Sequence, residues 1–515
     1  MLSVRRTLFA PLLLALAAPA CAPPKDAPPD SSLNLPDGGN DVDAGVEETV
    51  YPSVRFNPIA RFVDESGAVY SGQAGAWLGF GAPAALIPDA MAAGGFRSSL
   101  AIHAGIEGYV IPNVPEAAYY LRFNDTYVWS DARQQDLVST LVQRHDLDWS
   151  VPTGTGVQLH VTGLAPWKAS DMLRLSSPNG GTPMEDRRLV TPEDFGGTAP
   201  TVGATQLDVR FTRFLTLLEG GKGDSLWVQQ LSERPAVESA QPYTATVRSF
   251  RQPAFSLVAR QVAPLDAPLE GGTERHVSFA VNVAAFDTVA QGAHPAAKGP
   301  RLGRTTGHFW AIGARPGAEP FARLGANPEL AFAPVSIDLE RAQYEVSFLD
   351  AFPQEWRRVM MFSTGAMVSY GTAENPTLHP FLIQRYDTLD DVPTGAPLAP
   401  RLGAPRNLRV NGAPASGTLT GIGRSPVVSW DPPALGTPTR YFVELLTYAP
   451  GRNLSSTGKY LITGGTELRL PAEVVPTDSG FVIKVVATRN AGTRSPYEGE
   501  LPLDLAEAAT GLLTP

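Results

Sequence analysis

The chain has 515 residues, 43% of them hydrophobic and 18% charged, which is the composition of a globular protein with room for several domains. Its 49 glycines and 48 prolines are too frequent for long helices but suit many short strands joined by turns, so we expect an all-β protein. The net charge of −10 is a poor match for nucleic acid, and a single cysteine excludes an internal disulfide and a cysteine-based metal centre.

Residues 1–20 predict an export signal. Arg5 and Arg6 precede an apolar stretch that is too short to span a bilayer, and small residues then lead to Cys21. The segment resembles the signal of bacterial lipoproteins, although Ala18 stands where that family usually has a larger residue. The resemblance implies that Cys21 becomes the lipid-modified first residue of the mature chain. The alternative is an ordinary signal peptide cut after Ala20, with Cys21 left unmodified.

The same resemblance implies an outer-membrane location, because residue 22 is alanine rather than the aspartate that marks retention in the inner membrane. The membrane is then a partner through the lipid on Cys21.

No later stretch reaches 18 uninterrupted apolar residues. Residues 21–50 are rich in proline, aspartate and glycine, which predicts a disordered acidic linker. Asp41, Asp43 and Gly45 do not have the spacing of an EF-hand, so no calcium site is expected there.

Residues 51–150 predict a β-sandwich module, with alternating runs at 53–62, 96–103 and 119–129. Within it, residues 108–121 (GYVIPNVPEAAYYL) predict a strand, a proline-bounded turn and an aromatic strand. This segment resembles the hairpin of carboxypeptidase-regulatory-like (transthyretin-like) β-sandwiches, which implies a structural or binding module. An apolar stripe over 131–144 predicts a helix in the same module.

Residues 151–398 continue the strand-and-turn pattern and predict either one large or two smaller β-sandwiches. The clearest strand is expected at 276–286 (HVSFAVNVAAF), and a short helix is expected at 353–361. No fixed repeat period is present, so neither a propeller nor a solenoid is expected.

Residues 402–507 have the most regular alternation and predict an antiparallel sandwich of seven strands. The run at 481–488 (FVIKVVAT) places Phe481, Ile483 and Val485 on one face. Lys484 lies between them on the other face, where we expect it to point to water.

This last region resembles a fibronectin type III domain, which has an immunoglobulin-like fold. The family's opening A-P-x-N-L-x-V is present at 404–410, and its strand-B tryptophan before proline is Trp430. Tyr441 matches the strand-C tyrosine and Leu470 the leucine before proline, whereas Phe481 replaces the tyrosine of the tyrosine corner. The resemblance implies that these four side chains are core, not ligand-binding residues.

Motifs of catalysis are not found. There is no G-x-S-x-G or H-E-x-x-H, and the glycine-rich stretches at 79–84 and 220–224 fail the dinucleotide and Walker patterns. The seven histidines do not pair at metal-ligand spacing, and His145 with Asp146 and Asp148 is expected to be a surface turn. The tryptophans at 149, 167 and 227 are candidates for sugar stacking if exposed, although burial is the commoner fate.

We therefore expect a non-catalytic cell-envelope lipoprotein without cofactor, metal or nucleic acid. It would act in binding, adhesion or scaffolding toward an envelope protein or polysaccharide. The alternative is a secreted or surface hydrolase acting on carbohydrate or peptide. In that case residues 151–398 would hold a carboxylate pair and the type III domain would be an accessory module.

Overall fold

The computed structural model describes residues 52–73, 83–92, 94–104, 108–180, 187–189, 200–212, 214, 216–235, 242–297, 305–315, 329–336, 341–372, 374–392, 395–450, 452–491 and 499–515. The signal, Cys21 and the linker expected at 21–50 lie outside these residues. In the described part of the chain the regular secondary structure is almost entirely β-strand, with one α-helix, which confirms the all-β fold of stacked sandwiches. None of its helices is long and apolar enough to cross a membrane.

The first unit is a sandwich of two sheets. One sheet contains β1 (Val54–Val63), β2 (Val69–Gln73), β5 (Ile102–His103), β6 (Tyr109–Ile111) and β9 (Gln134–Leu141); the other contains β3 (Ala84–Pro88), β4 (Phe96–Leu100), β7 (Tyr119–Phe123) and β8 (Thr126–Ser130). Alternate residues of β1 and β7 point inward, and Phe56 and Leu121 meet in the core between the sheets.

Two expectations for this unit are wrong. Residues 131–144 contain strand β9 instead of a helix, because β9 pairs in parallel with β1 along its whole length, a long-range contact that the local apolar stripe does not report. The strands at 108–121 do not form a hairpin either. β6 pairs with β1 and β5, whereas β7 pairs with β3 and β8, so the proline-rich turn crosses from one sheet to the other.

The second unit is also a sandwich. A three-stranded sheet of β10 (Gly156–Thr162), β13 (Leu207–Phe211) and β16 (Val262–Pro268) faces β11 (Met172–Ser176), β12 (Arg187–Leu189), β14 (Leu226–Arg234) and β15 (Tyr243–Gln252). The alternation in β10 sends Val157, Leu159 and Val161 into a core of its own. This core is distinct from the larger core of the strands that follow, although Trp227 on β14 and Tyr243 on β15 pack into the larger one.

The third unit contains β17 (Glu274–Asn282), α2 (Val283–Gln291), β18 (Thr305–Ala314), β19 (Glu329–Ser336), β20 (Arg341–Leu349), β21 (Arg357–Gly371) and β22 (Pro376–Thr388). Stacked rings fill its core: Phe279 lies 4.3 Å from Phe309 between ring centroids. The strand expected at 276–286 ends at Asn282, because the Asn282 side chain accepts a hydrogen bond from the backbone N–H of Ala285 and caps α2. The helix expected at 353–361 is a turn followed by β21.

The fourth unit is a sandwich of two antiparallel sheets. One has the order β24-β23-β25-β28, formed by β23 (Arg406–Val410), β24 (Ala413–Pro414), β25 (Val427–Asp431) and β28 (Glu467–Arg469); the other has the order β27-β26-β29-β30, formed by β26 (Arg440–Thr447), β27 (Ser455–Thr463), β29 (Phe481–Ala491) and β30 (Gly499–Ala509). Trp430, Tyr441, Leu470 and Phe481 are all at most 3% exposed in its core. Leu513 pairs with Phe481 and Leu419, so the unit extends past residue 507.

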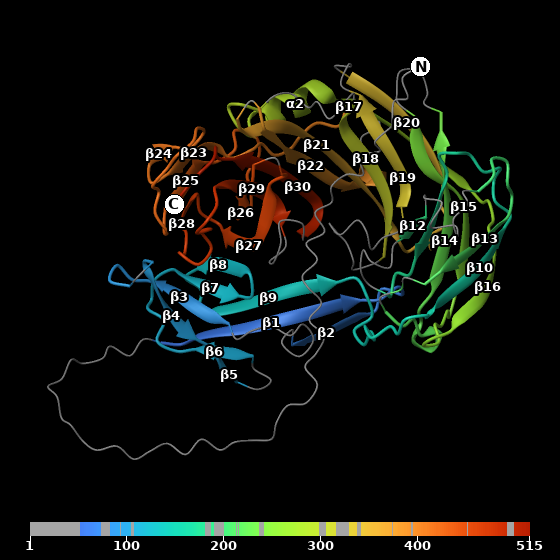
Figure 1. The fold of residues 1–515 in the computed structure, drawn as a ribbon, viewed down its shortest axis with the longest axis horizontal. Coiled ribbons are helices and arrows are strands. Elements are labelled where there is room, and N and C mark those ends of the chain that lie inside the picture. Colours follow the sequence, from blue (N-terminus) through green and yellow to red (C-terminus); the bar gives the residue numbers. More distant parts are fainter. Residues whose placement is uncertain are drawn as a thin grey trace, which may run out of the picture.

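The four units share one sheet. β22 of the third unit pairs with β30 of the fourth, and β27 of the fourth pairs in parallel with β8 of the first, within a sheet of 16 strands. Figure 1 shows the units arranged around a centre, with β1 and β9 running from beneath the fourth unit toward the second. Sheet pairing between units fixes their relative positions more firmly than a linker would.

Candidate functional site

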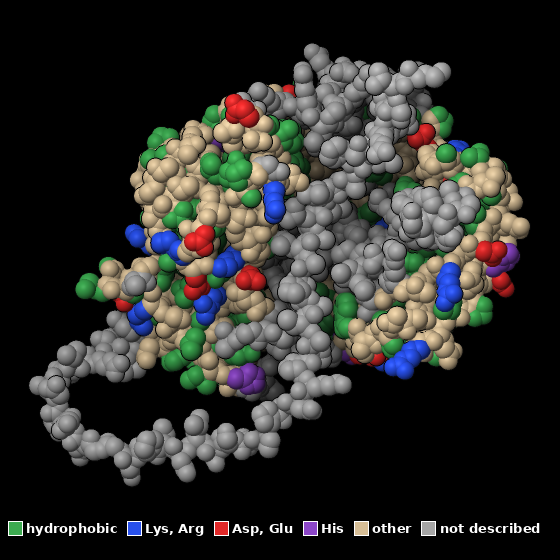
Figure 2. Space-filling view, viewed as in Figure 1, with side chains coloured by type: hydrophobic (Ala, Val, Ile, Leu, Met, Phe, Trp, Pro, Cys, Tyr) green, Lys and Arg blue, Asp and Glu red, His purple; other side chains and the backbone are tan. Residues whose placement is uncertain are grey.

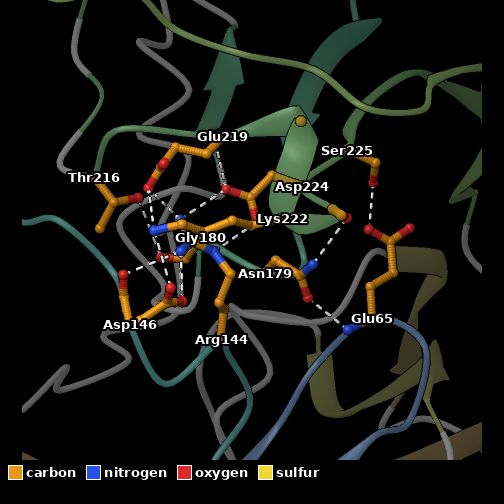
Figure 3. Close-up of polar contacts among 12 residues, drawn as sticks. Glu65, Arg144, Asp146, Asn179, Gly180, Thr216, Glu219, Lys222, Asp224 and Ser225 are labelled. Carbon is orange, nitrogen blue, oxygen red and sulfur yellow. Dashed lines mark hydrogen bonds and ion pairs between the residues drawn. The ribbon is translucent and has the colours of Figure 1, made fainter.

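The strongest concentration of polar contacts is where the first unit meets the second, which we name the junction cluster: Glu65, Arg144, Asp146, Asn179, Glu219, Lys222, Asp224 and Ser225 (Figure 3). At its centre, the Arg144 guanidinium forms a two-pronged ion pair with Asp224, with Nε–Oδ1 at 3.0 Å and Nη2–Oδ2 at 3.1 Å. Asp224 is fully buried and also accepts the backbone N–H of Glu219 at 2.7 Å. Burial raises the pKa of Asp224, while these hydrogen bonds oppose the rise.

In the outer rim of the cluster, one lysine bridges two carboxylates. Lys222 Nζ lies 2.9 Å from carboxylate oxygens of both Asp146 and Glu219. Lys222 belongs to a short 3₁₀ turn, η3 (Gly220–Lys222), so the glycine-rich stretch at 220–224 places a lysine for ion pairing. His145 stacks on Tyr70 at 4.2 Å between ring centroids. The cluster therefore joins the two units through ion pairs and hydrogen bonds.

Glu65 of the first unit is bound by side chains of the second unit. It lies in the turn between β1 and β2, is 6% exposed, and accepts hydrogen bonds from Ser225, from the Trp227 indole at 3.1 Å and from Arg251 at 3.1 Å. Its backbone N–H donates to Asn179. Three donors of the second unit thus satisfy the buried Glu65 carboxylate.

Arg315, directly after β18, joins the third unit to the first two. It is fully buried, and its guanidinium donates to the carbonyl oxygens of Val63 at 3.1 Å, Val142 at 3.5 Å and Pro178 at 2.6 Å. Burial lowers the pKa of Arg315 to about 10, so it stays charged at neutral pH. The Arg315 guanidinium thereby binds backbone carbonyl groups of both the first and the second unit.

A second charged junction links the third and fourth units. Arg401, in the segment between them, lies 2.7 Å from Asp387 on β22 and 2.9 Å from Asp504 on β30. Arg385 forms a further ion pair with Asp387, and Arg489 forms one with Asp504. The segment between the third and fourth units is therefore fixed by ion pairs on both sides.

The expectation that Lys484 points to water is wrong. Lys484 is 7% exposed, and its Nζ lies 2.7 Å from Glu444 and 3.4 Å from Glu507. The outer face of this sheet is covered by the third unit, where Phe381 on β22 packs with Val482, and the backbone N–H of Leu382 donates to Glu507. Strand alternation identifies the opposite face correctly but does not say what covers it.

The other residues singled out from the sequence are scattered. Trp167 and Trp227 are buried at 4% and 2% exposure, whereas Trp149 is 47% exposed. His160 contacts Asp208 at 2.9 Å and His276 contacts Ser347 at 2.7 Å, on different sheets. Among the described ranges no three histidine, cysteine or acidic side chains gather at metal-binding distance. Figure 2 shows acidic and basic side chains interspersed over the visible face.

A groove lies along the seam between the second and third units, formed by two open hollows of about 820 Å³ and about 450 Å³ that share Gly271, Gly272 and Leu349 as lining. No sequence motif predicted it. Of its three carboxylates, Glu274 forms an ion pair with Arg234 at 2.6 Å and Asp350 forms one with Arg358 at 2.7 Å. The third, Glu270, is exposed.

No model of a known protein family matches the chain, and no curated protein matches it.

Proposed function

We propose that the chain is a non-enzymatic, lipid-anchored protein of the cell envelope that presents a rigid β-sandwich body for binding or scaffolding. The observation that carries the proposal is the continuity of the sheet through β22–β30 and β27–β8. A body joined in this way holds surfaces of several units in fixed positions, which suits recognition more than a chain of freely moving modules. The signal and linker features of residues 1–50 would tether this body to the outer membrane.

The fourth unit supports the fibronectin type III part of the proposal. Its strands divide into one sheet of β23, β25 and β28 and another of β27, β26, β29 and β30, around a buried Trp430. That division suits an immunoglobulin-like sandwich with seven main strands. Type III domains are commonly spacers or binding modules, and both roles agree with a scaffold.

The first unit gives weaker support to the carboxypeptidase-regulatory-like resemblance. It is a two-sheet sandwich, but the segment 108–121 that carries the resemblance crosses between its sheets. We therefore propose only a non-catalytic sandwich module for residues 51–150.

The anchor is tested by labelling cells with radioactive palmitate and comparing the intact chain with a Cys21→Ala variant. We expect label in the intact chain, found in the outer-membrane fraction, and none in the variant. Equal labelling of the two, or an unlabelled chain released after cleavage at Ala20, would contradict the proposed anchor.

A further inference from the structure

The groove between the second and third units contains an arginine that has no hydrogen-bond or ion-pair partner among the described residues. Arg248 lines the larger hollow and is half-buried, and its Nε is buried without a hydrogen-bond partner. No ion pair of Arg248 occurs within the described part of the chain. The buried Nε cannot reach a ligand, but the two Nη groups make no hydrogen bond within the described ranges and have donors left for an outside acceptor.

Two local features put Arg248 in place. The register of β15 against β14 pairs Leu231 with Thr246 and Gln230 with Arg248, so Val247 is an extra bulged residue directly before the arginine. Bulges re-aim the side chains next to them. On the other side, a Cβ on Gly271 would lie 2.1 Å from Arg248 Nη1, so any larger residue at 271 would force the guanidinium to move from this position.

The charges of the larger hollow favour an anion. Three of its lining residues are cationic, Lys168, Arg234 and Arg248, whereas Glu274 is its one acidic residue and is already paired with Arg234. This local excess of positive charge occurs in a chain with a net charge of −10. A planar guanidinium matches the two oxygens of a carboxylate especially well.

The smaller hollow adds groups that suit hydroxyls. Glu270 and Gln354 line the same hollow and are exposed, and they supply an acceptor and an amide. The apolar lining residues Leu349 and Phe352 are buried, so the groove offers little of the open apolar pocket that anchors a peptide side chain.

We propose that this groove binds an acidic carbohydrate, with a sugar carboxylate on Arg248 and sugar hydroxyls on Glu270 and Gln354. Ligand sites are common at the seams between packed units. The inference rests on the proposed binding function and names its ligand class.

The test is binding of residues 51–515 to an array of oligosaccharides that carry uronic acids, together with neutral oligosaccharides and acidic peptides. We expect the uronate-bearing sugars to be retained in preference to the neutral ones. Arg248→Ala should weaken that binding about 10- to 100-fold, as expected for loss of a charged hydrogen-bond pair. Gly271→Ala should weaken it too, because the added methyl displaces the guanidinium without removing its charge.

The matched control is Arg210→Ala, which removes an exposed arginine from β13 on the opposite sheet and should bind like the unchanged chain. Thermal unfolding of each variant establishes that it is folded.

Absence of a preference for acidic sugars, or equal binding by Arg248→Ala, would overturn the inference. Retention of acidic peptides in place of sugars would overturn it as well. Palmitate labelling of Cys21 is independent, so a labelled chain that ignores acidic sugars contradicts this inference alone.

Discussion

Lys484 on β29 and Glu444 on β26 form an ion pair at 2.7 Å on the outer face of the fourth unit, where both side chains are buried beneath the third unit. Glu507 on β30 lies on the other side of the same ammonium, is also buried, and accepts the backbone N–H of Leu382 from β22. The contact between the two units is thus charged at this point, although Phe381, Val482 and Leu446 surround it with apolar surface.

We expect Lys484→Met to destabilise the chain by ~3–5 kcal/mol, because it leaves two buried carboxylates without their cation. The measurement is the free energy of unfolding of residues 51–515 in urea. The exposed Lys168 serves as control, and Lys168→Met should change the value by less than about 0.5 kcal/mol. An effect of Lys484→Met as small as that of the control would show that Lys484 is solvated and not part of a buried ion pair.

Acid should weaken the same region through His379 on β22. Burial, with the charge of Lys484 nearby, lowers the pKa of His379 to about 3. Since the folded-state pKa lies below the unfolded one, near 6.5, the neutral ring stabilises the fold above about pH 6.5. That contribution is lost as the pH falls toward 3. His379→Asn should therefore lose less stability than the unchanged chain between pH 6.5 and 4. Parallel pH curves for the two proteins would exclude His379 as the titrating group.

At the first junction, Asp224→Asn should cost about 1–3 kcal/mol, because the Arg144 guanidinium loses its buried carboxylate partner but keeps its ion pair with Asp146. Arg144→Met should cost a similar amount. The double variant should cost less than the sum of the two, with a coupling of about 1–3 kcal/mol. Additive losses in this double-mutant cycle would show that the pair does not act as a unit.

In the core of the fourth unit, Trp430→Ala should cost ~3–5 kcal/mol. Trp430 is 3% exposed and meets the Tyr441 ring at 5.2 Å between centroids, so its removal leaves a large cavity. Fluorescence-monitored urea unfolding measures the loss, and a stability equal to that of the unchanged chain would contradict the assignment of Trp430 to the core.

Local alternation was sufficient to predict which face of a strand is buried within its own sandwich. It placed Phe481, Ile483 and Val485 in the core, and all three are completely buried. It failed where a distant segment decides the outcome. Residues 131–144 look helical until β1 pairs with β9, and Lys484 looks solvated until β22 covers it.

The groove between the second and third units could not be predicted from the sequence either. Arg248, Gly271 and Leu349 are far apart in the chain, and no spacing rule connects them. The bulge at Val247 is a matter of register with β14, which appears only once the strands are paired. The cap at Asn282, in contrast, is a local signal, since asparagine is a preferred N-cap residue.

The central claim is that the units form one body, and calorimetric unfolding of residues 51–515 tests it most directly. We expect a single cooperative transition whose midpoint is lowered both by Arg144→Met at the first junction and by Lys484→Met between the third and fourth units. Separate transitions, with each variant shifting only the one that belongs to its own unit, would contradict the claim.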